Sequence, residues 1–209
     1  MLLASSIWRS RKLTNNGPNC KKLTDSLNRY LSTNNLILTN NGTTALQVAL
    51  SSLSLPAGGE VITTPYSFVA TSNAIIGASL KPVFVDIAQN SYNICPREIE
   101  KAITPKTIAI LPVHVYGVPS NVEAIQAISR KYNLPVIYDA AHSFGVTIKG
   151  KSLLSYGDLS ICSFHATKVF NTGEGGCIVP NSHADSSLYK LINFGFSSEN
   201  DIDCFGING

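Results

Sequence analysis

Ser163-Phe164-His165-Ala166-Thr167-Lys168 closes an apolar run that begins at Leu159 and is rich in residues that favour strands. Glycines at 173, 175 and 176 follow and let the backbone pass close to a bulky group. A lysine held at the end of a buried strand is partly desolvated. Desolvation lowers the pKa of its ammonium and leaves a nucleophilic amine, as a Schiff-base lysine requires. A single lysine is more often an exposed loop residue, so the rest of the chain has to decide between the two interpretations.

Apolar strands and amphipathic helices alternate along the chain. Strands are predicted at 60–64, 82–87, 107–113, 135–138, 159–164 and 177–180, with a short apolar run at 36–38. Helices are predicted at 20–31 (capped by Asn19), 45–50, 68–76, 96–102, 121–132 (capped by Asn121) and 184–193, after a short helix and turn within 1–18. This alternation predicts the α/β class, with a mainly parallel sheet flanked by helices. Ligands of such sheets bind at the carboxyl ends of the strands.

The composition excludes several classes of protein. The 209 residues are enough for one large or two small domains, and the net charge of +3 comes from basic residues that are not clustered, so no nucleic-acid surface is expected. No apolar run reaches transmembrane length, so no membrane partner is expected. The five cysteines contain no CxxC pair, which favours free thiols in a reducing, cytoplasmic compartment and no metal site.

Two further features lie near predicted strand ends. Gly42-Thr43-Thr44 opens a helix and offers backbone N–H groups, hydroxyls and the positive end of the helix dipole, although many helices begin this way without a ligand. Asp139 ends a buried strand, where it either caps a turn or binds a protonated ring nitrogen. Together with Lys168, one ligand accounts for all three: pyridoxal phosphate, bound through its aldehyde, its pyridine nitrogen and its phosphate. Phe68 either stacks on that ring or packs in the core.

With these residues in place, the chain resembles the DegT/DnrJ/EryC1/StrS sugar aminotransferases, which are pyridoxal-phosphate-dependent enzymes of fold type I. The resemblance covers nearly the whole chain and is carried by the segments 13–18, 41–46, 65–71, 112–117, 138–142, 163–168, 173–176 and 206–209. It implies the fold-type-I large domain, an aminotransferase activity and a homodimer.

The resemblance also implies roles for individual residues. Lys168 matches the Schiff-base lysine and Asp139 the partner of the pyridine nitrogen. Phe68 matches the residue that stacks on the ring, and His142 matches the position near the phenolic oxygen of the cofactor.

Four more residues match phosphate contacts of the family. Gly42, Thr43 and Ser163 match contacts within one subunit, and Asn208 matches an asparagine that reaches the phosphate bound to the neighbouring subunit.

Three polar residues near these motifs are expected to be structural. We expect His114 to be a core histidine, His165 to pack beside the lysine, and Glu174 to fix the turn that follows it.

Within the family, Ile7-Trp8, the segment 62–68, the segment 102–106 and the segment 168–172 match relatives that act on dTDP-4-keto-6-deoxyglucose. That likeness implies this nucleotide-linked keto sugar as the substrate and glutamate as the amino donor. It also implies that the product, dTDP-4-amino-4,6-dideoxyglucose, supplies a surface polysaccharide such as O-antigen.

Phe205 to Gly209 neither complete a strand nor cap a helix. We therefore expect residues 1–209 to be a truncated product, an N-terminal segment plus the cofactor-binding large domain, without the small C-terminal domain of the family. Two alternatives stay open: a relative that aminates another keto sugar, and a non-catalytic remnant that binds the cofactor or dimerises. A dehydratase of the same fold typically has histidine where Lys168 stands, so the lysine argues against a dehydratase. A dinucleotide-binding domain is disfavoured because no GxGxxG follows an early strand.

Overall fold

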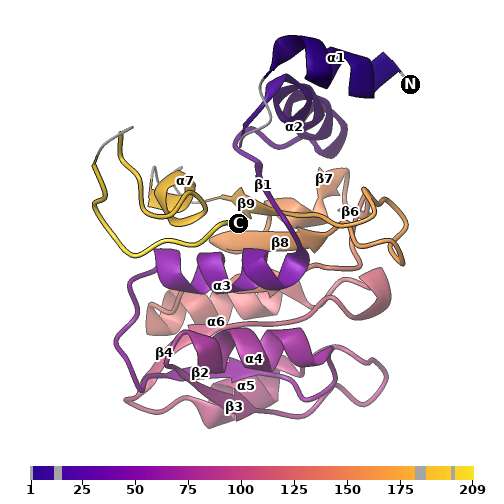
Figure 1. Cartoon of the computed structure of the whole chain (residues 1–209). Coiled ribbons are helices and arrows are strands. Elements are labelled where there is room, and N and C mark those ends of the chain that lie inside the picture. The colour runs from indigo at the N-terminus through magenta and orange to yellow at the C-terminus, as the bar shows by residue number, and fades with distance from the viewer. Residues whose placement is uncertain (1, 12–15, 182–186, 199–200) are drawn as a thin grey trace.

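The sheet of this protein is mainly parallel, with two antiparallel strand pairings toward one edge (Figure 1). The structure is a computed structural model and describes residues 2–11, 16–181, 187–198 and 201–209. The strand order in the larger sheet is β1 (Ile37–Thr39), β9 (Gly176–Pro180), β8 (Leu159–Ser163) and β5 (Ile137–Asp139). The order in the smaller sheet is β3 (Lys81–Phe84), β2 (Glu60–Thr63) and β4 (Thr107–Ile110). Two parallel bridges, Ile110 with Val136 and Val113 with Asp139, join β4 to β5 and so connect the two sheets.

Helices follow most of these strands. They are α1 (Leu2–Ser10), α2 (Pro18–Leu31), α3 (Gly42–Ser52), α4 (Val69–Gly77), α5 (Pro96–Ala102), α6 (Val122–Tyr132) and α7 (Ser187–Leu191). Two single turns of 3-10 helix, η1 (Val115–Gly117) and η2 (Leu153–Ser155), and a small hairpin of β6 (Thr147–Ile148) and β7 (Lys151–Ser152) complete the described elements. The hairpin and the 3-10 turns are too short to leave a periodic pattern, and the sequence did not predict them.

Helices cover both faces of the sheet. Successive strand residues point to opposite sides, so apolar residues at neighbouring positions give each face a surface on which helices pack. On one face Val61, Ile137 and Ile161 pack with the buried residues of α3, α4 and α7. On the other face Ile62 and Tyr138 pack with the apolar residues of α5 and α6, and Cys162, Cys177 and Val179 pack against α2. The strands are therefore apolar on both sides, which is typical of a sheet between two helical layers.

The predicted fold class is confirmed, and α5 and α6 match their predicted ranges. The prediction that Asn19 caps α2 is wrong: the helix begins at Pro18 with Gly17 at the cap, because proline sets the φ angle of a first helical residue in advance. β3 and β4 end three residues earlier than predicted, where only isolated bridges continue the pairing. Residues 184–186 of the predicted last helix and 12–15 of the predicted N-terminal turn lie outside the described residues.

All five cysteines are free thiols. Among the helices that the structure describes, none has both the length and the apolar character needed to cross a lipid bilayer.

Candidate active site

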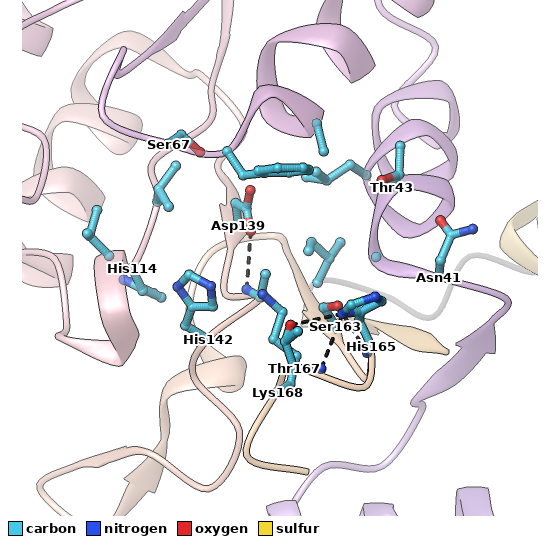
Figure 2. A pocket seen from close by; sticks show the side chains of 18 of the residues that line it. Asn41, Thr43, Ser67, His114, Asp139, His142, Ser163, His165, Thr167 and Lys168 are labelled. Carbon is cyan, nitrogen blue, oxygen red and sulfur yellow. Dashed lines mark hydrogen bonds between the residues drawn. The ribbon is translucent and has the colours of Figure 1, made fainter. Parts of the chain in front are cut away.

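A cavity of about 920 Å³ opens at the carboxyl ends of the strands (Figure 2). Seven of the eight residues predicted from the sequence line it: Gly42, Thr43, Phe68, Asp139, His142, Ser163 and Lys168. They come from the start of α3, the segment before α4, and the ends of β5 and β8. The parallel arrangement explains the convergence, because the carboxyl ends of parallel strands meet at one edge of a sheet.

Asn208 does not line this cavity. It is exposed, and its carbonyl oxygen accepts a hydrogen bond of 3.1 Å from the side-chain amide of Asn40, next to the start of α3. Its predicted role in a neighbouring subunit stays a prediction.

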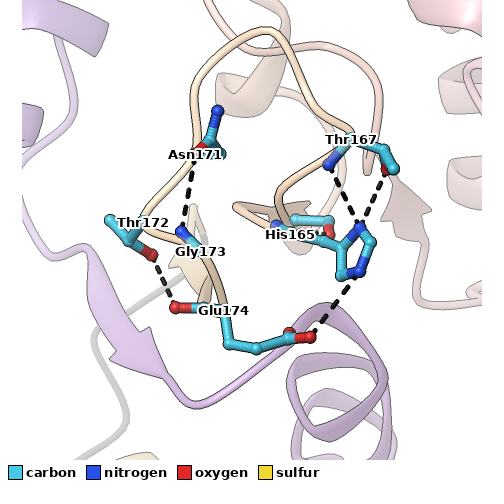
Figure 3. A network of polar contacts seen from close by, with 7 residues as sticks. His165, Thr167, Asn171, Thr172, Gly173 and Glu174 are labelled. Carbon is cyan, nitrogen blue, oxygen red and sulfur yellow. Dashed lines mark hydrogen bonds and ion pairs between the residues drawn. The ribbon is translucent and has the colours of Figure 1, made fainter.

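Lys168 is half-buried in the loop that leaves β8. A short turn positions it, since its backbone N–H donates to the carbonyl of His165 at 2.9 Å. The Nδ1 atom of His165 accepts from the backbone N–H of Thr167 at 3.2 Å and lies 2.9 Å from the Thr167 hydroxyl (Figure 3). The Nε2 atom of His165 lies 3.6 Å from a carboxylate oxygen of Glu174. His165 therefore contacts the loop on both sides of Lys168, at Thr167 through Nδ1 and at Glu174 through Nε2.

The glycine-rich turn after Lys168 closes through short polar contacts (Figure 3). The hydroxyl of Thr172 donates to the carbonyl of Glu174 at 2.6 Å, and Gly173 has a φ of +80°, which favours glycine. This turn returns the chain to β9, which runs beside β8.

Asp139 is buried, with 5% of its surface exposed. One carboxylate oxygen accepts from the hydroxyl of Thr71 at 2.7 Å, and the other accepts from the backbone N–H of Ala141 at 3.2 Å. Burial raises the pKa of this carboxyl, and the opposing influences come from the Thr71 and Ala141 hydrogen bonds and from the nearby His142 and Lys168.

The start of α3 forms a cradle beside Ser163. Asn41 caps the helix, since its side chain accepts from the backbone N–H of Thr44 at 2.8 Å. A Cβ atom on Gly42 would lie 3.0 Å from Cβ and 3.3 Å from Oγ of Ser163, so glycine allows the helix to begin against the end of β8. The first turn of a helix has N–H groups without intrahelical partners, which suit an anion.

Two aromatic rings border the cavity. Phe68 is 76% exposed, so the alternative that it packs in the core is wrong. His142 follows the end of β5, and its ring is nearly parallel to that of Tyr116 at a centroid distance of 6.1 Å. Burial lowers the pKa of His142, the positive charge of Lys168 lowers it further, and Asp139 opposes both, so the ring is mostly neutral at neutral pH.

His114 is fully buried, as predicted for a core histidine, although it also lines the cavity. Its Nδ1 atom accepts from the backbone N–H of Ser120 at 3.1 Å, and its ring stacks on Tyr138 at 4.4 Å. Burial lowers its pKa to about 3, so it is neutral at physiological pH.

Sequence reasoning assigned no role to Thr71, which binds Asp139, or to Tyr66 and Tyr116, whose hydroxyls lie 3.1 Å apart at the edge of the cavity. A signal existed for Thr71, because it follows Phe68 by three residues at the start of a helix and so lies about one turn from it. Nothing local pointed to the tyrosine pair, whose members are fifty residues apart.

The residues fit pyridoxal phosphate in type and placement: an amine, a buried carboxylate and a glycine-containing helix start face one cavity at the carboxyl ends of strands. The fold and the family match place the chain in the class of pyridoxal-phosphate-dependent sugar aminotransferases. The chain belongs to the DegT/DnrJ/EryC1/StrS aminotransferase family, whose model matches residues 2–208.

Relatives in this family share both sequence and fold with the chain. It is 53% identical over 204 residues to a dTDP-4-amino-4,6-dideoxy-D-glucose transaminase of Shigella dysenteriae, covering 97% of this chain and 55% of the relative. It is 48% identical to the enzyme of the same name from Escherichia coli, again over 97% and 55%. The solved structure of NtdA from Bacillus subtilis with bound cofactor PMP matches with a TM-score of 0.89 at 34% identity, over 98% of this chain and 47% of that one. The chain thus spans about half the length of the relatives it matches.

Proposed function

We propose that this chain is the cofactor-binding part of an enzyme that transfers an amino group from glutamate to dTDP-4-keto-6-deoxyglucose. The product is dTDP-4-amino-4,6-dideoxyglucose, a precursor for a surface polysaccharide such as O-antigen. The observation that carries the proposal is the convergence of Lys168, Asp139 and the Gly42–Thr43 helix start on one cavity. The names and identities of the Shigella and Escherichia relatives support the choice of sugar.

We propose that residues 1–209 correspond to the N-terminal segment and large domain of such an enzyme. The rest of the relatives' length would supply a small C-terminal domain, and the active protein would be a cytoplasmic homodimer. Asn208 would then serve the site of the neighbouring subunit.

In the proposed site, each residue performs one task on the bound cofactor. Lys168 would hold its aldehyde end, Asp139 would hold the proton on its ring nitrogen, and Phe68 would cover one face of the ring. His142 lies at the side of its phenolic oxygen. Gly42, Thr43 and Ser163 bind its phosphate, where the helix dipole and the N–H groups favour negative charge.

The bound cofactor supplies an electron sink that stabilises the carbanion left when the substrate loses its Cα proton. Once the amino donor has displaced Lys168 from the aldehyde, the freed amine would remove the Cα proton as the general base and, as the general acid, would deliver it to the carbon that carried the aldehyde. Asp139 is buried, so little water would screen its charge from a protonated ring nitrogen held against it. The same residues would serve the second half of the reaction, in which Lys168 would deliver the proton to the C4 carbon of the sugar.

The first test is whether Lys168 carries the cofactor. The purified chain is mixed with pyridoxal phosphate, reduced with borohydride and digested, and the adduct is located by mass spectrometry. We expect the adduct on Lys168, and we expect Lys168→Ala to lose both the adduct and the visible absorption of the complex. Lys151→Ala, which changes an exposed lysine of β7, is the matched control. An adduct spread over several lysines would refute the assigned role.

The second test compares nucleotide sugars that carry the keto group at C4 and at C3. Amination of the 4-keto sugar alone supports the proposed substrate, and amination of the 3-keto sugar identifies a different member of the family. An adduct on Lys168 without turnover of either sugar would indicate a cofactor-binding module rather than a complete enzyme.

A further inference from the structure

Two hydroxyl groups form a hydrogen-bonded chain that ends at the buried carboxylate of Asp139. The Oγ1 atom of Thr71 is 2.7 Å from Oδ2 of Asp139 and 2.6 Å from Oγ of Ser67. Thr71 is only 1% exposed, so bulk water does not reach its hydroxyl. Ser67 is half-buried and lines the cavity, so the row of oxygens runs from the cavity edge to the carboxylate.

The charge on Asp139 sets the direction of these hydrogen bonds. An ionised carboxylate can only accept, so the single proton of the Thr71 hydroxyl points to Asp139. The oxygen of Thr71 is then free to accept from the hydroxyl of Ser67, which is the only arrangement that satisfies both short distances with an ionised Asp139. The second carboxylate oxygen is held by the N–H of Ala141. Both oxygens of Asp139 therefore face donors, an arrangement that stabilises the ionised form.

The position of Thr71 in the fold gives this contact a second consequence. Thr71 is the third residue of α4, whose cap residue is Phe68, so one helical turn carries both the threonine and the ring that borders the cavity. The positive end of the helix dipole adds to the field that favours an anion there. The helix α4 follows β2 of the smaller sheet, whereas Asp139 ends β5 of the larger sheet. The hydrogen bond between Thr71 and Asp139 thus fixes the carboxylate relative to Phe68.

Few other groups balance the burial of Asp139. Burial raises the pKa of this carboxyl, and the Thr71 hydrogen bond is the largest of the influences that lower it, ahead of Ala141, His142 and Lys168. Since His142 is mostly neutral at neutral pH, Lys168 is the one cation near Asp139 among these groups. The neutral donors Thr71 and Ala141 are therefore the two largest influences that oppose the effect of burial on Asp139.

We propose that Thr71 is a positioning residue for Asp139. The hydroxyl of Thr71 keeps the Asp139 carboxylate ionised and directed at the ring nitrogen of the cofactor. The identity of that ring rests on the function proposed above. The hydroxyl of Ser67 orients Thr71 and contributes less, because it touches Asp139 only through its neighbour.

The first measurement needs no cofactor. The pKa of Asp139 is followed by NMR of the labelled carboxyl carbon in the whole chain, with Asp139→Asn to assign the signal. Thr71→Val keeps the shape of the side chain and removes the donor, whereas Thr71→Ser keeps the donor and removes the methyl group. We expect Thr71→Val to raise the pKa of Asp139 by about one to two units, the equivalent of one hydrogen bond to a charged group, and Thr71→Ser to leave it near that of the unmodified chain.

The second measurement tests the link to the ring nitrogen. Affinity is measured for pyridoxal phosphate and for its analogue in which carbon replaces the pyridine nitrogen. We expect Thr71→Val to weaken binding of pyridoxal phosphate by roughly threefold to tenfold, at most the worth of one such hydrogen bond. We expect the same variant to bind the carbon analogue as well as the unmodified chain does, because that analogue offers Asp139 no protonated nitrogen.

Three outcomes would overturn the proposal: an unchanged pKa of Asp139 in Thr71→Val, equal effects of Thr71→Val and Thr71→Ser, or equal weakening of both ligands. If Thr71→Val fails to fold by circular dichroism, Ser67→Ala takes its place, with a smaller upward shift of the Asp139 pKa expected and no shift refuting the hydroxyl chain. If Thr71→Val shifts the pKa of Asp139 but neither the unmodified chain nor any variant binds the cofactor, Thr71 still acts on Asp139 but not toward a cofactor ring. That result would count against both proposals. Binding with no effect of Thr71→Val would count against this one alone.

Discussion

The substitution Gly176→Ala tests how closely β9 approaches the start of α3. Gly176 pairs with Thr39 of β1 and with Ser163 of β8, so it lies in the middle of the larger sheet. A Cβ atom at this position would lie 2.7 Å from the carbonyl carbon of Asn41, 2.8 Å from its oxygen and 2.9 Å from the backbone nitrogen of Gly42. All three obstacles are backbone atoms, which cannot rotate away as the end of a side chain can.

The size of the effect follows from this overlap. The segment that opens α3 would have to retreat by about 0.7 Å to reach an ordinary contact of 3.4 Å. Overpacking of this kind costs about 1–3 kcal/mol, and a backbone obstacle places Gly176→Ala in the upper half of that range. For a chain of this length, a loss of about 2–3 kcal/mol lowers the Tm by roughly 4–12 °C.

The assay is thermal unfolding followed by circular dichroism, together with titration of pyridoxal phosphate. Gly77→Ala is the matched control: Gly77 ends α4, and its added Cβ would meet only Nε2 of Gln47, at 3.7 Å. We expect this control to be neutral or stabilised by up to about 1 kcal/mol, because alanine restricts the unfolded chain. We also expect Gly176→Ala to bind the cofactor more weakly than Gly77→Ala. Equal melting temperatures for the two variants would refute the argument from the backbone approach.

Three further predictions concern the cap, the buried histidine and the thiols. Asn41→Ala and Asn121→Ala each remove a side-chain cap from a helix start, so urea unfolding should show a loss of about 1 kcal/mol for both, whereas only Asn41→Ala should weaken binding of pyridoxal phosphate. Because burial lowers the pKa of His114 to about 3, the unfolded chain binds one more proton than the folded chain between that pH and about 6.5. Stability should therefore fall as the pH drops through this window by about 1.4 kcal/mol per unit, and His114→Gln should lose that part of the slope when unfolding is measured from pH 4 to 7. Burial also raises the pKa of Cys162 to about 12, so iodoacetamide should modify the exposed Cys20 in the folded protein and Cys162 only after unfolding, as peptide mass spectrometry can show.

Several parts of the fold could be predicted from local sequence. Asn121 caps a helix that ends at Tyr132, and Pro96 begins one that ends at Ala102, because capping and proline act within a single turn. The strand before Lys168 was predicted because the run from Leu159 is rich in apolar residues that favour strands, and all five of its residues are buried. The cap of α2 was mistaken because Asn19 and Gly17-Pro18 offer competing start signals in three consecutive positions.

The candidate site was predicted as a set of residues without distances. Motif likeness pointed to Lys168, Asp139 and the Gly42–Thr43 helix start, and the structure brings all of them to one cavity. Motif likeness did not identify Thr71 as the donor to Asp139, since the two residues are sixty-eight positions apart and a threonine in a helix has many other uses. For Phe68 the sequence left two alternatives, stacking in the site or packing in the core, and the 76% exposure of the side chain in the structure excludes the core.

The amino-acid sequence by itself determined the alternation of strands and helices, the turn chemistry after Lys168 and the types of side chain available at strand ends. These depend on periodicity, caps and glycines, which act over a few neighbouring residues. Only the tertiary structure decided that the bridges from β4 to β5 join the two groups of strands, and that Thr71 of α4 therefore reaches Asp139. Contacts between distant segments depend on how the layers pack, and packing is a property of the whole core that no short window of sequence contains.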